Sequence, residues 1–390
     1  MVVFKYFFYI FLSCSVLGCV GVNTAVKEEI VDQKPLNQFQ KNLLEKLEQK
    51  IAQRKTINTF LAWNPDKPQS RYGLAWAKYI KPSKHTITLN ELYWNYHYVG
   101  NPWHHYPGIE KFLTDRDWDH DAEYGKTLAT KIIDPDYPNF VVSVAKGKLA
   151  SDRSNGIMFD WWHNYHTSGY TENQVQSARK NIALELRKFL GPGGIILVNS
   201  SWVKDRATTR YINGVFLELS KTPYDNSSHR LYRPSELKKM EDMLEYYEKN
   251  LAYPKLVALE GWRKTENLSD SDRNSKENRK MAKLMTAMSV VVNSNGYILY
   301  ADNNNDTPNG DHDHFYYDFY SFDIGKPSGP MIEASSGVRY KEHQKGLIAY
   351  NLSSRSRSFK RNNGTVVEIA PYSGLFCSDT STGLNCLPYD

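Results

Sequence analysis

The chain has 390 residues, a net charge of +6 and a pI near 8.8, and its Lys and Arg residues are spread among the acids without a dominant run. Nucleic-acid binding therefore gains no support, because that function concentrates basic residues on one face or in one segment. The length excludes a small module and suits one large domain with an appendage.

The N-terminus has the features of an export signal. Lys5 precedes an unbroken apolar stretch, Tyr6–Leu12, and small residues follow. This order is typical of a secretory signal, and the stretch is shorter than the about 20 residues that a membrane-spanning helix needs. The segment Val16–Cys19 resembles a bacterial lipobox, which predicts a signal peptide at residues 1–18, lipidation of Cys19 and a membrane-anchored protein of the cell envelope. An ordinary signal peptide cleaved a few residues later is the alternative.

Residues 19–54 are polar and helix-prone, which predicts a tether and an N-terminal amphipathic helix. Over residues 55–331, short apolar or β-branched runs alternate with helical patterns, as in βαβ units around a parallel sheet. An eightfold alternation predicts an α/β fold, a (β/α)8 TIM barrel. The expected strands are either Thr59–Trp63 or Tyr72–Trp76, and then Thr86–Trp94, Thr130–Ile133, Gly156–Phe159, Ile195–Val198, Gly214–Leu217, Leu256–Leu259 and Tyr297–Tyr300.

Helical spacing of apolar residues predicts helices at Thr171–Leu190, Pro234–Leu251 and Asn278–Val292. Residues 332–390 have the turn-rich, β-branched pattern of a small antiparallel β element. Cys14 is expected to leave with the signal peptide and Cys19 to carry lipid, so that Cys377 and Cys386 remain. These two cysteines predict a disulfide formed in an oxidising compartment.

Acidic residues directly follow or end several apolar strand segments. In a parallel barrel the working residues lie at the carboxyl ends of the strands, so we expect some of these acids to meet at one mouth. Any single one has an alternative role, because acids at strand ends also cap helices and bind rim Arg or Lys residues. The six positions are Glu91, Asp134, Asp160, Glu218, Glu260 and Asp302.

The barrel segments also carry a family resemblance. One strand ends in Asp and is followed by a Pro-Asp-Tyr helix start. A second strand ending in Asp comes next, and a later strand ends in Glu. The segments that carry the resemblance are Ile132–Tyr137, Asn155–Trp162, Asn213–Glu218, Asp323–Pro327, Arg339-Tyr340 and Gly346–Asn351. Together they resemble glycoside hydrolase families related to the α-galactosidase-like and polygalactosaminidase-like barrels, over roughly residues 55–375. The third βα unit departs from the family pattern, because Lys126–Ile133 lacks a clear tryptophan and the helix after Asp134 is short.

The resemblance implies that Asp160, at the end of the fourth strand, is a nucleophile and that Glu218, at the end of the sixth, is the acid/base. Glycosidic cleavage needs two such carboxyl groups, one to attack the anomeric carbon and one to protonate the leaving oxygen. Glu260 is the reserve candidate for the acid/base. Expected substrate contacts are Glu91, Tyr93, Trp161, Trp162, His163, His166, Asn199, Trp202, Trp262 and Asp302.

The predicted function is therefore an exported glycoside hydrolase acting on a poly- or oligosaccharide, without a cofactor. A catalytically silent glycan-binding barrel at the cell surface is the alternative from another class. His163 and His166, and the cluster His312-Asp313-His314, have spacings compatible with a metal site, but no stronger ligand motif accompanies them and no metal is predicted. A metal-dependent polysaccharide deacetylase is disfavoured for the same reason.

Overall fold

The computed structural model describes the chain in ten stretches, which are residues 35–63, 71–76, 84–100, 106–117, 126–150, 154–163, 169–219, 232–263, 273–302 and 312–388. The predicted signal peptide, the lipidation site Cys19, most of the tether and His166 lie outside these stretches. None of the helices within them has the length and apolarity needed to cross a membrane.

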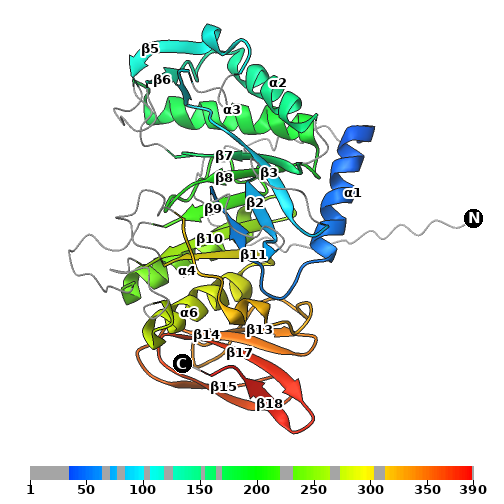
Figure 1. Cartoon of the computed structure of the whole chain (residues 1–390), viewed down its shortest axis with the longest axis vertical. Coiled ribbons are helices and arrows are strands. Elements are labelled where there is room, and N and C mark those ends of the chain that lie inside the picture. The colour runs from blue at the N-terminus through cyan, green and yellow to red at the C-terminus, as the bar shows by residue number, and fades with distance from the viewer. Residues whose placement is uncertain are drawn as a thin grey trace, which may run out of the picture. The chain divides into compact units, whose positions relative to one another are not determined.

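Eight parallel strands form the central sheet of the unit Leu36–Asp390 (Figure 1). The first and last strands also meet, since the N–H of Ile298 donates to the carbonyl of Asn58 at 2.9 Å and Thr59 bridges Ile298 in parallel. The predicted (β/α)8 barrel is therefore confirmed. In sheet order its strands are β1 (Phe60–Leu61), β2 (Leu74–Trp76), β3 (Ile87–Leu92), β7 (Gly156–Phe159), β8 (Ile195–Asn199), β9 (Gly214–Glu218), β10 (Leu256–Trp262) and β11 (Asn295–Ala301).

Two strand predictions need correction. Both candidates for the first strand are barrel strands, whereas Thr130–Ile133 is not one. The chain turns after Thr130, where the N–H of Asp134 donates to the carbonyl of Lys131, so these residues cannot continue into a barrel ladder. Instead an antiparallel sheet is inserted between β3 and the next helix, with the order β4 (Tyr96–Tyr98), β6 (Thr127–Thr130), β5 (Leu113–Asp117), and a 3-10 turn at Ile109–Phe112 precedes β5.

The helices begin and end at strong local signals. Thr171 caps the third helix by accepting the N–H of Gln174, whose side chain accepts the N–H of Thr171 in return. The helix stops at Gly191, whose φ of 63° lies in the left-handed region that favours glycine. The three predicted helices are present to within two residues at each end. Besides the 3-10 turn at Ile109–Phe112, the helices of the described stretches include α1 (Gln38–Ala52), α2 (Tyr137–Leu149), α3 (Glu172–Leu190), α4 (Pro234–Asn250), α6 (Lys276–Val292) and a 3-10 helix, η4 (Asp318–Ser321).

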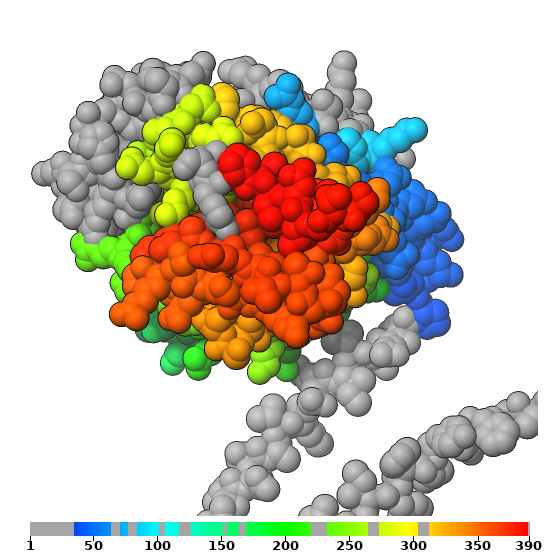
Figure 2. Space-filling model, turned by 90° about the horizontal axis from the view of Figure 1, so that it is seen from below, coloured from blue at the N-terminus to red at the C-terminus, as the bar shows by residue number. Residues whose placement is uncertain are grey.

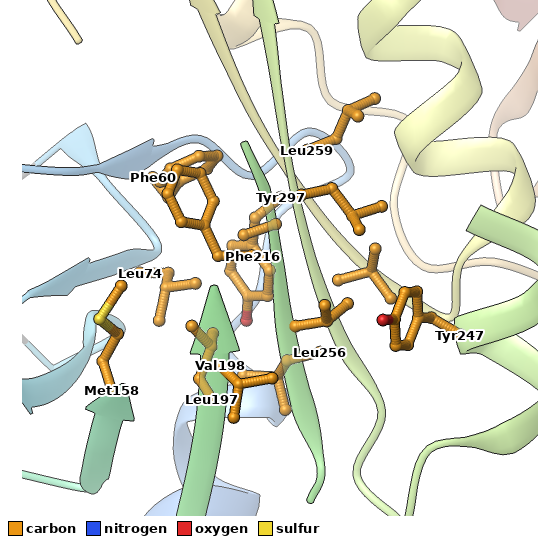
Figure 3. Packing of buried hydrophobic residues seen from close by; sticks show 14 of the residues in the cluster. Phe60, Leu74, Met158, Leu197, Val198, Phe216, Tyr247, Leu256, Leu259 and Tyr297 are labelled. Atoms are coloured by element: carbon orange, nitrogen blue, oxygen red, sulfur yellow. The ribbon is translucent and has the colours of Figure 1, made fainter. Parts of the chain in front are cut away.

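Side chains fill the barrel interior (Figure 3). Phe60 and Phe216 come from β1 and β9, which are not neighbours in the sheet, yet their rings meet edge to face at 5.5 Å. Such a contact between non-adjacent strands runs through the barrel. Trp76 packs on both rings, at 5.6 and 5.4 Å. The interior is therefore a packed core, and chemistry is confined to the rim.

The C-terminal residues form an antiparallel sheet with the order β12 (Ile332–Glu333), β13 (Arg339–His343), β14 (Gly346–Asn351), β17 (Ser373–Thr380), β18 (Gly383–Cys386), and a hairpin of β15 (Arg357–Lys360) and β16 (Val366–Ile369). These strands make up much of the surface in Figure 2. Cys377 and Cys386 are paired across β17 and β18 and are disulfide-bonded. Helix α6 contacts both the barrel strands and this sheet, which explains why it is buried on nearly every side.

Candidate active site

Three consecutive barrel strands bring two carboxyl groups and one amide together. Asp160 follows β7, Asn199 ends β8 and Glu218 ends β9, so all three lie at the same rim. The Asn199 Nδ2 donates to Oδ1 of Asp160 at 2.8 Å and to Oε2 of Glu218 at 2.6 Å. The nearest oxygens of the two carboxyl groups therefore cannot lie farther apart than the sum of these two lengths. Asn199, expected to contact substrate, is the bridge between the predicted catalytic pair.

Asp160 sits in an environment that disfavours its ionised form. Its side chain is buried, and the carboxyl groups of Glu91 and Glu218 add negative charge nearby. Burial first, and then these two charges, raise the pKa of Asp160 to about 8, although hydrogen bonds from Asn199 and from the Trp161 N–H favour the carboxylate. The protonated form of Asp160 is accordingly favoured at neutral pH.

This shift predicts a pH-dependent gain in stability from Asp160→Asn. The folded protein binds the Asp160 proton more tightly than the unfolded chain, whose aspartates have a pKa of about 3.9, so wild-type stability falls as pH rises from about 4 to about 8. The amide has no charge to bury. We expect the variant to gain on the order of a few kcal/mol over the wild type at pH 9 and little at pH 4, measured by thermal unfolding. The control is Asp136→Asn at an exposed position. A stability difference between Asp160→Asn and the wild type that does not change with pH would contradict the raised pKa of Asp160 as its cause.

Glu260 and His312 form a second polar pair beside Glu218. Glu260 is in register with Glu218 on the neighbouring strand and is completely buried. His312 places Nδ1 2.8 Å from Oε1 of Glu260 and Nε2 4.0 Å from Oε1 of Glu218. The buried, hydrogen-bonded position of Glu260 makes it a poor proton donor to a substrate, so the reserve assignment as acid/base does not fit this geometry.

Glu218, Glu260 and His312 also form the group in the described stretches whose ligand atoms lie close enough together to hold a metal ion. These atoms are all within 4.8 Å of one another. Nδ1 of His312 and Oε1 of Glu260 already share a hydrogen bond, and an ion would have to replace it.

Glu91 lies at the site as an acceptor. Its Oε1 receives hydrogen bonds from Trp63 Nε1 at 2.7 Å and from the Tyr93 hydroxyl at 3.0 Å. Burial and the charge of Glu91 raise the pKa of Tyr93 well above its usual value, so the hydroxyl stays protonated. Glu91 therefore shapes the charge around Asp160, and Trp63 is a site residue that the sequence analysis placed only in a strand.

Left-handed backbone conformations gather at this rim. Trp63 (φ 40°), Trp161 (φ 54°) and Ser201 (φ 48°) follow β1, β7 and β8, and His312 (φ 58°) lies in the loop after β11. Among the described residues, Tyr372 is the other non-glycine with positive φ. Side chains rarely adopt this conformation, and it persists where surrounding contacts hold it, as at functional sites.

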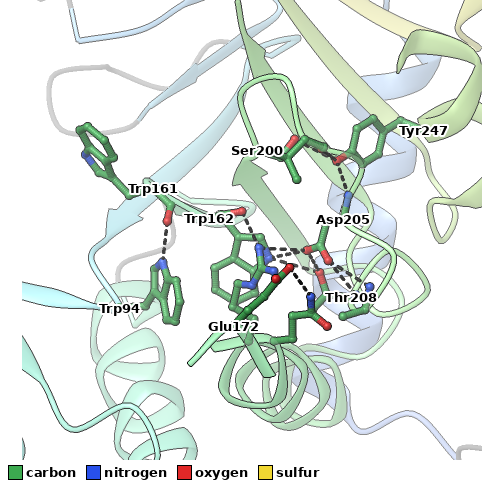
Figure 4. Close-up of polar contacts among 12 residues, drawn as sticks. Trp94, Trp161, Trp162, Glu172, Ser200, Asp205, Thr208 and Tyr247 are labelled. Carbon is green, nitrogen blue, oxygen red and sulfur yellow. Dashed lines mark hydrogen bonds and ion pairs between the residues drawn. The ribbon is translucent and has the colours of Figure 1, made fainter. Parts of the chain in front are cut away.

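The two tryptophans that follow Asp160, both expected to contact substrate, lie in different environments. Trp162 is completely buried, and its Nε1 donates to Oδ2 of Asp205 at 2.8 Å (Figure 4). It therefore supports the turn from within the core and, being completely buried, offers no face to a sugar. Trp161 remains partly exposed at the rim, whereas His163 is buried beside it, with ring centres 5.4 Å apart.

Trp262 and Asp302 are also buried, contrary to the expectation that they contact substrate. Trp262 packs against His312, with ring centres 5.2 Å apart. Asp302 accepts hydrogen bonds from the Tyr317 hydroxyl at 2.6 Å and from the Phe315 N–H at 3.0 Å, and so fixes the loop after β11. Of the remaining predicted contacts, Trp202 is partly exposed, with a lysine ammonium 4.6 Å from its ring centre.

His312 is the residue whose place the sequence analysis missed. Its histidine-rich segment suggested only a metal site, and the long connection from β11 gave no indication that the ring would reach β9 and β10. The ring packs against Trp63, with centres 4.6 Å apart, and against Trp262. An unusual clustering of histidine and aspartate after the last strand was the available signal.

No protein-family model and no curated protein matches the chain. Among solved structures, it is similar to the glycoside hydrolase domain of PelA from Pseudomonas aeruginosa, with 12% identity, a TM-score of 0.42 and coverage of 66% of this chain and 97% of that one. It is also similar to Eubacterium rectale Amy13B, with 10% identity, a TM-score of 0.47 and coverage of 88% and 97%. A third is Aspergillus fumigatus Ega3 in complex with galactosamine, with 11% identity, a TM-score of 0.37 and coverage of 57% and 86%. At these values neither activity nor substrate follows from the likeness.

Proposed function

We propose that this protein is a glycoside hydrolase that cleaves a poly- or oligosaccharide with Asp160 as nucleophile and Glu218 as acid/base. The observation that carries the proposal is the Asn199 amide bridging both carboxyl groups. The upper limit applies to the nearest oxygens of the two groups, and it suits the about 5 to 5.5 Å separation typical of retaining enzymes better than the about 6.5 to 9.5 Å by which inverting enzymes admit a water. The proposal is therefore a retaining mechanism.

In the first step Asp160 attacks the anomeric carbon while Glu218 gives its proton to the departing glycosidic oxygen. In the second step Glu218 removes a proton from water, whose oxygen attacks the anomeric carbon and releases Asp160. The raised pKa of Asp160 means that the resting pair holds a proton on the nucleophile. Asp160 attacks as the carboxylate, so its proton leaves to solvent before this step, and positive charge developing on the sugar favours the carboxylate.

The rim supports a carbohydrate as the substrate class. Trp161 and Trp202 are partly exposed, and aromatic faces of this kind stack on the apolar faces of sugar rings. Tyr93, kept protonated, and Asn199 are hydroxyl partners in this proposal. We place Trp162, Trp262 and Asp302 in supporting roles.

A panel assay tests the function. Purified mature protein is incubated with polysaccharides and with 4-nitrophenyl glycosides, and new reducing ends or released nitrophenol are measured. Hydrolysis of at least one member, abolished in Asp160→Asn, supports the proposal. Binding on a glycan array without any product, unchanged in Asp160→Asn, would instead identify a silent glycan-binding barrel.

We further propose that the protein is exported and anchored through a lipid on Cys19. The lipobox-like segment Val16–Cys19 motivates this, and a disulfide between Cys377 and Cys386 suits an oxidising compartment. An alkyne fatty acid fed to expressing cells is expected to label the wild type and Cys14→Ala but not Cys19→Ala, as measured by in-gel fluorescence. Equal labelling of all three proteins would exclude the anchor.

A further inference from the structure

The pair formed by His312 and Glu260 has no part in the two-carboxyl mechanism, yet it is built into the same rim. Glu260 is completely buried, and a carboxylate there costs several kcal/mol unless it is paired. Its Oε1 meets Nδ1 of His312 at 2.8 Å. The imidazole is held between Trp63 and Trp262, with ring centres 4.6 and 5.2 Å away. An arrangement this constrained fixes the orientation of the His312 ring.

The fixed ring directs its other nitrogen at the proposed acid/base. With Nδ1–H donating to Glu260, Nε2 lies 4.0 Å from Oε1 of Glu218. Two placements of a single proton are then possible in the Glu260–His312–Glu218 row. Either the imidazole is a cation beside a Glu218 carboxylate, or a neutral imidazole faces a protonated Glu218.

We propose that His312, oriented by Glu260, is a positioning residue that supplies and takes back the proton of Glu218. This inference rests on the proposed glycosidase function. When substrate binds, the 4.0 Å gap between Nε2 of His312 and Oε1 of Glu218 closes to a hydrogen bond and the proton crosses it; Glu218 then gives this proton to the leaving oxygen. When Glu218 deprotonates the incoming water, the proton returns to Nε2 and restores the imidazolium. Glu260 stays a carboxylate throughout and accepts from Nδ1–H.

The charged surroundings of His312 are consistent with this role. In the described part of the chain, the groups facing the ring are Glu218 from β9 and Glu260 from β10. On its own loop, Asp313 pairs with an arginine at 3.0 Å and His314 meets the Tyr72 hydroxyl at 2.7 Å. On the β1 side, the Trp63 ring lies against the imidazole. The Nε1 of Trp63 donates a hydrogen bond to the carboxylate of Glu91.

The variant His312→Asn tests the inference without demanding a new backbone. Asparagine tolerates the left-handed φ of 58° better than most residues, and its Nδ2 takes the place of Nδ1 while nothing replaces Nε2. We expect kcat on phenyl glycosides of the sugar cleaved in the panel to fall about 10- to 100-fold with little change in KM. The matching 2,4-dinitrophenyl glycoside needs no proton for its leaving group, so its glycosylation step should fall less than about threefold.

His314→Asn, on the same loop, is the matched control and should affect both substrates equally. Equal losses on both substrates in His312→Asn would assign the ring a merely structural role and overturn the inference. Absence of hydrolysis in the wild type would count against the proposed function instead.

A measurement that needs no turnover distinguishes a failure of the His312 inference from a failure of the proposed glycosidase function. The pKa of His312, followed by NMR of the labelled imidazole nitrogens, should fall by at least about one unit in Glu218→Gln and in Glu260→Gln, because each change removes a negative charge next to the ring. The titration of His314 should stay constant. An unchanged His312 titration in Glu218→Gln would overturn the proton exchange even in an active enzyme.

Discussion

Asp160→Asn and Glu218→Gln are each expected to lower turnover by at least about a thousandfold while leaving the fold intact. Each amide is nearly isosteric with the acid it replaces, and its oxygen can still accept the hydrogen bond from Asn199. What is lost is the attacking charge at one position and the transferable proton at the other. Turnover on the best panel substrate measures the loss of activity, and circular dichroism measures whether the fold is retained.

The two variants should also differ from each other. Glu218→Gln is expected to retain more activity on the 2,4-dinitrophenyl glycoside, because that leaving group departs unprotonated, whereas Asp160→Asn loses activity on every substrate. Added azide should rescue Asp160→Gly by attacking in place of the missing carboxylate. The control is Asp136→Asn, which removes one carboxylate charge at a position where the side chain is 69% exposed and away from the site. Full activity in either amide variant would refute the catalytic pair.

Asp205→Ala is expected to cost about 3 to 5 kcal/mol of unfolding free energy. Asp205 is buried, accepts from Trp162 Nε1 at 2.8 Å and from the Thr208 hydroxyl, and lies 3.9 Å from the buried guanidinium of Arg179 (Figure 4). Its removal leaves that cation without its carboxylate and the indole without its acceptor. Urea denaturation measures the loss.

This network also supports the site, since the Trp162 N–H donates to the carbonyl of Asn199 at 2.8 Å and so ties the turn after Asp160 to β8. A double-mutant cycle provides the control. Arg179→Met combined with Asp205→Leu should recover much of the lost stability, because neither buried charge remains. A loss below about 1 kcal/mol in Asp205→Ala would mean that the charge pair does not anchor this turn.

The sequence by itself determined the architecture and where its acids stand along the strands. Alternating apolar runs and helical spacing specify a barrel, because each strand must be buried and each helix must cover it. Asp160 and Glu218 follow runs such as Gly156–Phe159 directly, and that local order already places them at the rim. Helix limits were similarly local, since the Thr171 cap and Gly191 act within one turn.

The tertiary structure alone decided which side chains meet there. Barrel strands are buried on both faces, so they lack the polar alternation that would tell an inward residue from an outward one. Trp161 and Trp162 lie in the turn after β7, where no periodic pattern applies, so they looked equivalent although Trp162 enters the core and Trp161 lies at the rim. Bridging by Asn199 and the approach of His312 to Glu260 join residues from different strands and a distant loop. Such contacts depend on how side chains from separate elements are oriented at the rim, which no local pattern specifies.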